Sequence, residues 1–450
     1  MSNFESLNLN KQLLNALGDL GLTSPTAIQE QAFNVILSGD DVVGIAQTGT
    51  GKTFAYLLPI LNTVKYSLQK HPRILIMVPT RELVLQVVEN INELCAYMDV
   101  RVLGVYGGTN MNTQKKAIDK GADVVVATPG RLYDLILSRA IRLKEIKRLV
   151  IDEVDVMLDL GFRFQLTNIF ELLPERRQNI MFSATMTSDV DTLIDDFFIS
   201  PKRITIAVSG TPLENIEQSC YSVPNFFTKL NLLNHILSDK EEYSKVILFV
   251  SIKRSADKIY DALHEVFGDE IGVLHANKSQ NFRIRTIGEF NENKLRVLVT
   301  TDVMARGIDI EKVSHVINFD VPKYPENYMH RIGRTGRAKE KGSTILLFTA
   351  KEEKRKAAIE ELMNMEIPIL EIPQEVEIAK ELTPEEMPYK SKTKSNFKEL
   401  EKGELPPGFH EKKAKNKKVA IKGSVRRRKK AEKYNKPQTK RVNKKKVKKR

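Results

Sequence analysis

The stretch Ala46-Gln-Thr-Gly-Thr-Gly-Lys-Thr53 constrains the fold of this 450-residue chain more than any other. It follows the apolar run 42–45 and precedes a second apolar run, 54–58. This order predicts a strand, a tight glycine-rich turn and a helix whose N-terminal N–H groups converge on one point, as in a phosphate-binding P-loop. Lys52 offers a positive charge for phosphates, and the Thr53 hydroxyl suits a Mg²⁺ ion. A chance Gly/Thr turn is the alternative, and the flanking strand and helix argue against it.

Short β-rich runs alternate with helical segments after this loop, which predicts parallel sheets covered by helices on both faces. The predicted strands of a first domain are residues 74–78, 101–105, 124–127, 149–151 and 180–182. A second cycle begins near residue 221, with predicted strands at 246–250, 271–274, 297–300, 315–318 and 343–348. We therefore expect an α/β chain with domains at 1–208 and 221–372, a linker at 209–220 and a charged extension at 373–450.

The net charge of +14 belongs to the C-terminal end of the chain. Residues 411–450 contain 21 Lys/Arg and 2 Asp/Glu, whereas the other 410 residues contain 50 and 55. Such a tail has few large apolar groups, so we expect it to stay disordered without a partner and to bind nucleic acid or another polyanion. A tail that only raises solubility is the alternative.

Membrane insertion and secretion are not expected from this sequence. Its longest apolar runs are far too short to cross a bilayer, and the N-terminus lacks a signal-peptide pattern. The two cysteines, Cys95 and Cys220, are far apart and lack metal-binding spacing. We expect them to be buried free thiols in a reducing cytoplasm.

Polar side chains follow the predicted strands directly, at the edge where ligands bind in parallel sheets. The segments are Pro79–Leu83, Thr128–Arg131, Asp152–Asp155 and Ser183–Thr185. An aspartate such as Asp152 suits Mg²⁺ held through water, and Glu153 beside it suits the orientation or deprotonation of an attacking water. A solvated acidic turn is the alternative for this segment.

The second domain offers positive charge in His330-Arg-Ile-Gly-Arg-Thr-Gly-Arg337. Arginines neutralise developing charge in phosphoryl transfer. RNA binding and pairing with neighbouring acids remain open alternatives for Arg331, Arg334 and Arg337. In the first domain, the amide of Gln29 matches the N6/N7 edge of adenine, although its spacing alone does not separate this role from a plain surface position.

Together these residues and motifs resemble the DEAD-box RNA helicases over residues 4–348, with the motifs in the family's order. The resemblance implies two tandem RecA-like parallel-sheet domains and an RNA-dependent ATPase that uses ATP and Mg²⁺. Asp152-Glu-Val-Asp155 and the basic tail resemble most closely the cold-shock type of this family in bacilli. Val154, Leu22 and Ala276 depart from the family's usual residues.

The family's roles transfer to matching positions of this chain. ATP binding is implied for Phe4, Leu22, Thr26, Gln29, Thr48, Gly49, Thr50, Gly51, Lys52, Thr53 and Asp309, with Thr53 and Asp152 holding the metal. The implied catalytic residues are Lys52, Asp152, Glu153, Arg334 and Arg337. RNA contacts are implied for Thr80, Arg81, Gly107, Gly108, Thr128, Gly130, Arg131, Arg283, Thr301, Arg306 and Gly307. Coupling of the two sites is implied for Asp155, Ser183, Thr185 and His330.

The resemblance also implies how the parts act. RNA and ATP favour closure of the two domains, and a bent single strand in the closed form separates a short duplex locally. Contacts to phosphates and 2′-OH groups give little sequence preference. Cold adaptation, ribosome assembly and RNA turnover are the expected settings for a monomer, with ribosomes or RNA-decay factors as possible partners. An ATP-gated RNA clamp and a DNA helicase are the alternatives.

Deletion of residues 411–450 tests the role of the tail. We expect weaker RNA binding and a flatter dependence of affinity on salt, because phosphate contacts release counterions. The ATPase rate at saturating RNA should stay similar. Affinity measured across a salt series checks this, and an unchanged slope would refute the role of the tail as a tether.

Overall fold

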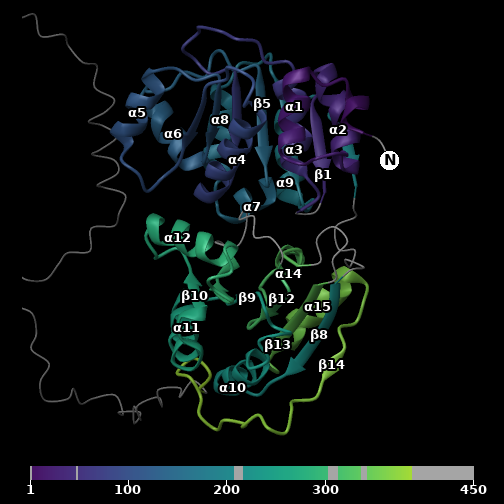
Figure 1. Ribbon diagram of the computed structural model, residues 1–450, viewed down its shortest axis with the longest axis vertical. Coiled ribbons are helices and arrows are strands. Elements are labelled where there is room, and N and C mark those ends of the chain that lie inside the picture. Colours follow the sequence, from purple (N-terminus) through teal and green to yellow (C-terminus); the bar gives the residue numbers. More distant parts are fainter. Residues whose placement is uncertain (1–2, 47–48, 207–215, 303–312, 336–341, 388–450) are drawn as a thin grey trace, which may run out of the picture. The chain divides into compact units, whose positions relative to one another are not determined.

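The computed structural model describes residues 3–46, 49–206, 216–302, 313–335 and 342–387 (Figure 1). The chain divides into the units Met1–Met387 and Pro388–Arg450. The basic tail and residues 209–215 of the expected linker lie outside the described residues. No helix in the described part of the chain is both long and apolar enough to cross a bilayer.

Seven parallel strands form the first sheet, in the order β3-β4-β2-β5-β6-β1-β7. They are β1 (Val42–Ile45), β2 (Ile74–Met77), β3 (Val102–Val105), β4 (Val124–Ala127), β5 (Arg148–Asp152), β6 (Gln178–Ser183) and β7 (Lys202–Thr205). Strand side chains alternate between two cores, with Ile74 and Ile76 on one face and Leu75 and Met77 on the other. Both faces are therefore buried, as a parallel sheet requires.

Helices cover both faces of this sheet (Figure 1). The first core takes η1 (Phe4–Leu7), α1 (Lys11–Asp19), α2 (Ala27–Ser38), α3 (Lys52–Asn62) and α4 (Arg81–Leu94). The second core takes α5 (Met111–Asp119), α6 (Pro129–Leu137), α7 (Val154–Asp159), α8 (Arg163–Leu172) and α9 (Ser188–Phe197).

The second sheet repeats the topology of the first, in the order β10-β11-β9-β12-β13-β8-β14. Its strands are β8 (Ile216–Ser222), β9 (Val246–Phe249), β10 (Ile271–Leu274), β11 (Val297–Thr300), β12 (His315–Asn318), β13 (Gly342–Phe348) and β14 (Ile369–Leu370). Its helical segments are α10 (Phe226–Leu237), α11 (Lys253–Phe267), η2 (Gly268–Glu270), α12 (Gln280–Asn291), α14 (Pro325–Ile332) and α15 (Glu353–Met363). With β8 as the counterpart of β1, the two strand orders are the same.

The alternating strands predicted from the sequence are confirmed, whereas β7, β8 and β14 are additional. Strand β7 lies at an edge of its sheet and reads Lys-Arg-Ile-Thr, with only Ile204 buried. Strand β14 is the other edge strand of this kind and has two exposed residues. Edge strands with one or no buried position lack the apolar run that identifies a central strand.

The chain continues in contact with the second domain beyond residue 372. Asn225 donates from Nδ2 to the carbonyl of Ala379 at 2.6 Å, and the Phe226 N–H donates to Glu386 Oε1 at 2.7 Å. Val376 is buried in the core beside α10. Residues 373–387 therefore pack on the second domain before the undescribed tail begins.

Charged residues anchor three neighbouring strands of the first sheet at their N-terminal ends. Asp123, which is buried, accepts hydrogen bonds from Arg73 at 2.8 Å and Arg101 at 3.0 Å. Each of these residues directly precedes a strand, namely β4, β2 and β3. Burial alone would raise the pKa of Asp123, but the hydrogen bonds from Arg101 and Arg73 outweigh it and lower the pKa.

Asp123→Asn should destabilise the first domain by about 1–3 kcal/mol, because two arginines lose their carboxylate. The lowered pKa means that this stabilisation is present above the unfolded-state pKa near 3.8 and is lost as the pH falls through the folded-state pKa. In denaturant unfolding, the difference in the free energy of unfolding between the variant and the parent chain should therefore be larger at pH 7 than below about pH 4. An equal difference at both pH values would contradict this assignment.

Candidate functional site

The glycine-rich loop joins β1 to α3 at the carboxyl edge of the first sheet. The Ala46 N–H donates to the Ser183 carbonyl at 3.1 Å, and α3 begins at Lys52. Gly51 has φ 87°, and a Cβ there would lie 2.5 Å from Nε2 of Gln29. The positive φ therefore favours glycine at this position, and a Cβ would displace the amide of Gln29. Thr48, predicted to bind ATP, lies outside the described residues.

Gln29 ties this loop to helix α2. Its Nε2 donates to the Gly51 carbonyl at 3.2 Å, and its Oε1 accepts from the Thr26 N–H at 3.0 Å as part of a capping box. Phe4 is buried in the core, whereas Leu22 is 40% exposed. Their predicted contacts with adenine stay predictions.

A strained turn places two carboxylates beside the loop. Asp152 ends β5, and Glu153 adopts the left-handed conformation with φ 55° before α7 begins. This conformation is rare for a residue with a side chain and is often found at functional sites. Val154, where the family usually has another residue, is fully buried in the second core of this domain.

The buried polar atoms at this edge that have no hydrogen-bond partner among the described residues include Nζ of Lys52, Oδ1 of Asp152 and Oε2 of Glu153. The side chains are 7%, 3% and 9% exposed. Buried charged groups are costly without a partner. A cation beside the carboxylates and an anion beside the ammonium would satisfy them, so this group fits a metal–polyphosphate ligand.

The two aspartates of this segment have opposite electrostatics. Burial raises the pKa of Asp152 to about 6, supported by the charge of Glu153 and opposed by Lys52. Burial also acts to raise the pKa of Asp155, but hydrogen bonding and charge from His330, the charge of Lys52 and the Thr185 hydroxyl together lower it well below its usual range. Asp155 is therefore held as a carboxylate.

The residues predicted to couple the two sites lie together around Asp155. Its Oδ2 accepts from the Thr185 N–H at 3.1 Å and the Thr185 hydroxyl at 2.8 Å, and lies 3.5 Å from Nε2 of His330. Ser183 donates to the Thr185 carbonyl at 2.7 Å. This cluster links β6 and α7 of the first domain to α14 of the second.

The arginines of the second domain have different environments. Arg331 is 1% exposed and donates to Asp302, Asn318 and the Asp320 carbonyl. It is therefore a structural residue, which is the acid-pairing alternative considered for this segment. Arg334 is also buried, at 3% exposed. Asp309, Arg306, Gly307 and Arg337 lie outside the described residues.

Residues predicted to contact RNA follow β2, β3 and β4. Thr80 caps α4 by accepting from the Leu83 N–H at 3.3 Å. Arg131 donates to the Thr109 carbonyl at 3.1 Å and to Gln114 Oε1 at 2.9 Å, so it holds the loop after the glycine pair. A Cβ on Gly108 would lie 2.0 Å from Nη1 of Arg81. The remaining positions described in the structure are Gly107, Thr128 at the start of α6 and Gly130 in the first domain, and Arg283 and Thr301 in the second.

Arg283 of α12, predicted to contact RNA, is paired with a carboxylate of the protein. It forms an ion pair with Glu82 of α4, and Gln280 donates to the same carboxylate at 3.0 Å. Glu82 is 8% exposed. Glu82 and Gln280 are thus contact residues that no motif predicted, although Glu82 lies within the Pro79–Leu83 segment.

Comparison with known proteins agrees with this arrangement. The DEAD/DEAH box helicase family profile matches residues 26–193, and that of the helicase conserved C-terminal domain matches residues 228–339. The RNA helicase CrhR of Synechocystis sp. is 35% identical over 83% of this chain and 75% of its own. The DEAD-box ATP-dependent RNA helicase CshA of Bacillus cereus is 36% identical over 83% of this chain and 70% of its own. The chain belongs to the DEAD-box helicase family.

This chain covers different fractions of the length of its relatives. ATP-dependent RNA helicase DeaD of Buchnera aphidicola is 37% identical over 82% of this DEAD-box chain, which spans only 61% of that protein. Among known structures, S. cerevisiae Dbp5 bound to RNA and ADP BeF3 matches with a TM-score of 0.74 at 28% identity, over 83% of this chain and 96% of its own. Mss116p bound to ssRNA and AMP-PNP matches with a TM-score of 0.75 at 28% identity, over 82% and 79%. The two tandem RecA-like domains predicted from the sequence are thus confirmed.

His330→Ala tests the cluster around Asp155. The variant leaves a buried carboxylate without its partner from the second domain, so we expect RNA-stimulated ATP hydrolysis to fall by about 10-fold or more. Nucleotide affinity should stay within about 2-fold, since the loop and acids lie in the first domain. Equilibrium nucleotide binding and steady-state ATPase rates measure the two effects. His235→Ala, an exposed histidine of the same domain, is the matched control; normal hydrolysis in both variants would contradict this role.

Proposed function

We propose that this DEAD-box chain is an RNA-dependent ATPase that unwinds or remodels short RNA duplexes. The observation that carries the proposal is the set of three buried charged atoms, on Lys52, Asp152 and Glu153, that have no partner in the described part of the protein. Their charges match those of a polyphosphate and its metal ion. The relatives named as RNA helicases, and the similar structures bound to RNA and nucleotide, support the same function.

In this proposal the first domain binds and orients the nucleotide. Gly49, Thr50 and Gly51 shape the loop, and Lys52 binds the phosphates. Thr53 and Asp152 would hold Mg²⁺, which supplies neutralisation of phosphate charge. Glu153 positions or deprotonates the attacking water from the turn that follows β5. The pKa of Asp152, raised by burial, fits a carboxylate that needs a cation at that edge.

The second domain completes the reaction. Arg334 and Arg337 would stabilise the developing charge, as arginines do in phosphoryl transfer. The contacts of His330 with Asp155 and of Arg283 with Glu82 join residues of both domains, one beside the ATP loop and one beside the RNA-binding segments. RNA that favours these contacts would thereby favour hydrolysis. Contacts to phosphates and sugars give little sequence preference.

The setting of this function is also a proposal. The proposed setting is a monomer in the cytoplasm that acts in cold adaptation, ribosome assembly or RNA turnover. The two buried free thiols, Cys95 and Cys220, fit a reducing compartment. Ribosomes or RNA-decay factors would be its partners. An ATP-gated RNA clamp would use the same nucleotide site but would not separate strands. A DNA helicase would be stimulated by DNA. Measurements of unwinding and of ATPase stimulation therefore distinguish both alternatives from an RNA helicase.

Unwinding of a short RNA duplex tests the proposal. With ATP present, the parent chain should separate the strands of the RNA duplex and should not separate a DNA duplex of the same sequence. Lys52→Ala should abolish nucleotide binding, whereas Glu153→Gln should keep ATP and RNA bound but reduce hydrolysis by about 100-fold or more. Glu145→Gln, an exposed glutamate of the same domain, is the matched control.

The outcomes separate the alternatives. Tight RNA binding that needs ATP, without strand separation at any enzyme concentration, would indicate a clamp. Stimulation of the ATPase by DNA as strong as by RNA would indicate a DNA helicase. Normal turnover in the Glu153→Gln variant would show that the acidic turn does not position the water.

A further inference from the structure

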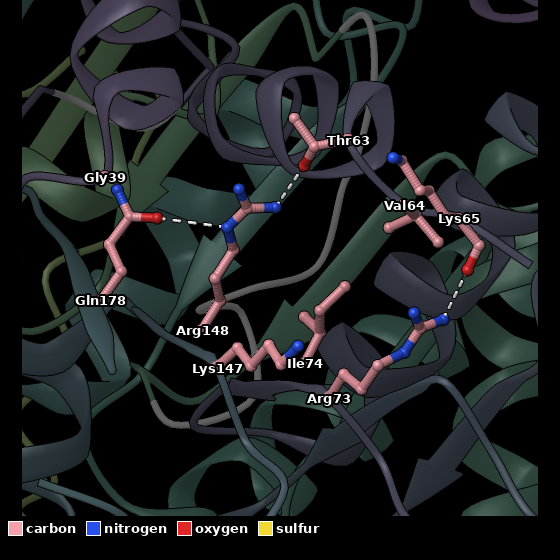
Figure 2. A pocket seen from close by; sticks show the side chains of 9 residues that line it. All are labelled: Gly39, Thr63, Val64, Lys65, Arg73, Ile74, Lys147, Arg148 and Gln178. Carbon is pink, nitrogen blue, oxygen red and sulfur yellow. Dashed lines mark hydrogen bonds between the residues drawn. The ribbon is translucent and has the colours of Figure 1, made fainter. Parts of the chain in front are cut away.

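A cavity of about 410 Å³ lies at the N-terminal edge of the first sheet, opposite the edge that carries the ATP site (Figure 2). Ile74, Arg148 and Gln178 are the first residues of β2, β5 and β6. The strand register places Arg148 directly beside Ile74 on one side and Gln178 on the other. Three adjacent strands therefore form a fixed row at the base of the cavity.

The charged side chains that line the cavity are all basic. Four of the lining side chains are cationic and none is acidic; the lining residues are Gly39, Thr63, Val64, Lys65, Arg73, Ile74, Lys147, Arg148 and Gln178. Arg73 shares the carboxylate of Asp123 with Arg101 and thus contributes little net charge. Lys65 and Lys147 are exposed at the rim. The cavity consequently carries positive charge without a compensating acid in its wall.

Arg148 is held by neutral groups only. Its Nε donates to Gln178 Oε1 at 3.2 Å, and its Nη1 donates to the Ile60 carbonyl at 3.3 Å and to the Thr63 hydroxyl (Figure 2). Gln178 is itself fixed by donating to the carbonyls of Ile36 and Asp40 at 2.8 Å. In the described part of the chain, no carboxylate pairs with Arg148 and no hydrogen bond engages its Nη2. Burial without a counter-ion lowers the pKa of this arginine.

We propose that this cavity binds a small anion that carries two or more phosphate groups. Its volume lies in the range of small-molecule sites, and the Nη2 group of Arg148, with no partner in the described part of the chain, lies in a lining that also holds the two exposed ammonium groups of Lys65 and Lys147. No aromatic side chain lines the cavity, so stacking on a base contributes nothing to recognition. Phosphate groups, and not a nucleobase or an extended RNA strand, match this chemistry.

A purely structural role accounts for only part of the geometry. The contacts of Arg148 with Ile60 and Thr63 place a cation at the C-terminal end of α3, where the helix dipole favours it. These contacts engage one of its nitrogen atoms, Nη1. A structural role does not explain the exposed lysines at the rim, Lys65 after α3 and Lys147 directly before Arg148, or a lining without acids.

Lysine footprinting of the full chain tests the proposal at the cavity itself. Inorganic tripolyphosphate is the probe, with ADP and Mg²⁺ present to occupy the ATP site. Acylation of Lys65 and Lys147, quantified by mass spectrometry, should fall as the probe is added, while Lys120 of the same domain stays reactive. Lys147→Glu should raise the concentration that half-protects Lys65 by about 10-fold, because it places a carboxylate beside the phosphates.

Lys144→Glu is the matched control, since it makes the same charge change at an exposed lysine outside the lining. It should shift the half-protecting concentration by less than about 3-fold. RNA-stimulated ATPase activity retained in both variants shows that the domain is folded. Equal protection of Lys120, equal shifts in both variants, or no protection would overturn the proposal. Stronger protection by a single-stranded RNA oligomer than by tripolyphosphate would assign the cavity to RNA and overturn the small-anion assignment.

Discussion

The burial of unpaired charge at the carboxyl edge of the first sheet is the constraint on which the site depends. Lys52, Asp152 and Glu153 come from two different strand–helix junctions, and the parallel sheet brings these junctions to the same edge. The same sheet buries both of its faces, so water does not compensate these groups fully. The buried charges therefore destabilise the unliganded fold at this edge, and a bound metal–nucleotide would offset that cost by pairing with them.

The sequence was sufficient to predict the central strands and the segments that follow them. The P-loop spacing and the apolar runs before Asp152 and Ser183 carry local information about both chemistry and secondary structure. Pairing partners were not predictable in this way. Arg331 and Arg334 are three residues apart in one motif, yet Arg331 is saturated by Asp302 and Asn318. Which arginine is structural depends on residues that are distant in sequence, and no spacing rule within the motif encodes them.

Gln29 and Glu82 show the same limit in another form. A side chain assigned to a ligand from its chemistry also serves the protein, since Gln29 caps α2 and holds the Gly51 carbonyl. Glu82 lies in a segment assigned to RNA, but it is buried against Arg283 and Gln280 of the other domain. A motif thus identifies a region of the fold, and the contacts within that region decide what each member does.

The repeated topology explains how two similar domains contribute different halves of one function. Strand β12 is the counterpart of β5, so α14 follows it as α7 follows β5. In the first domain this position carries acids, including Asp155; in the second it carries His330, Arg331 and Arg334. The two equivalent positions meet in the contact between Asp155 and His330. One architecture with opposite charge at the same junction thereby gives a contact that neither domain holds alone. The sequence does not reveal this relation, because the two domains share strand order and not residue identity at these positions.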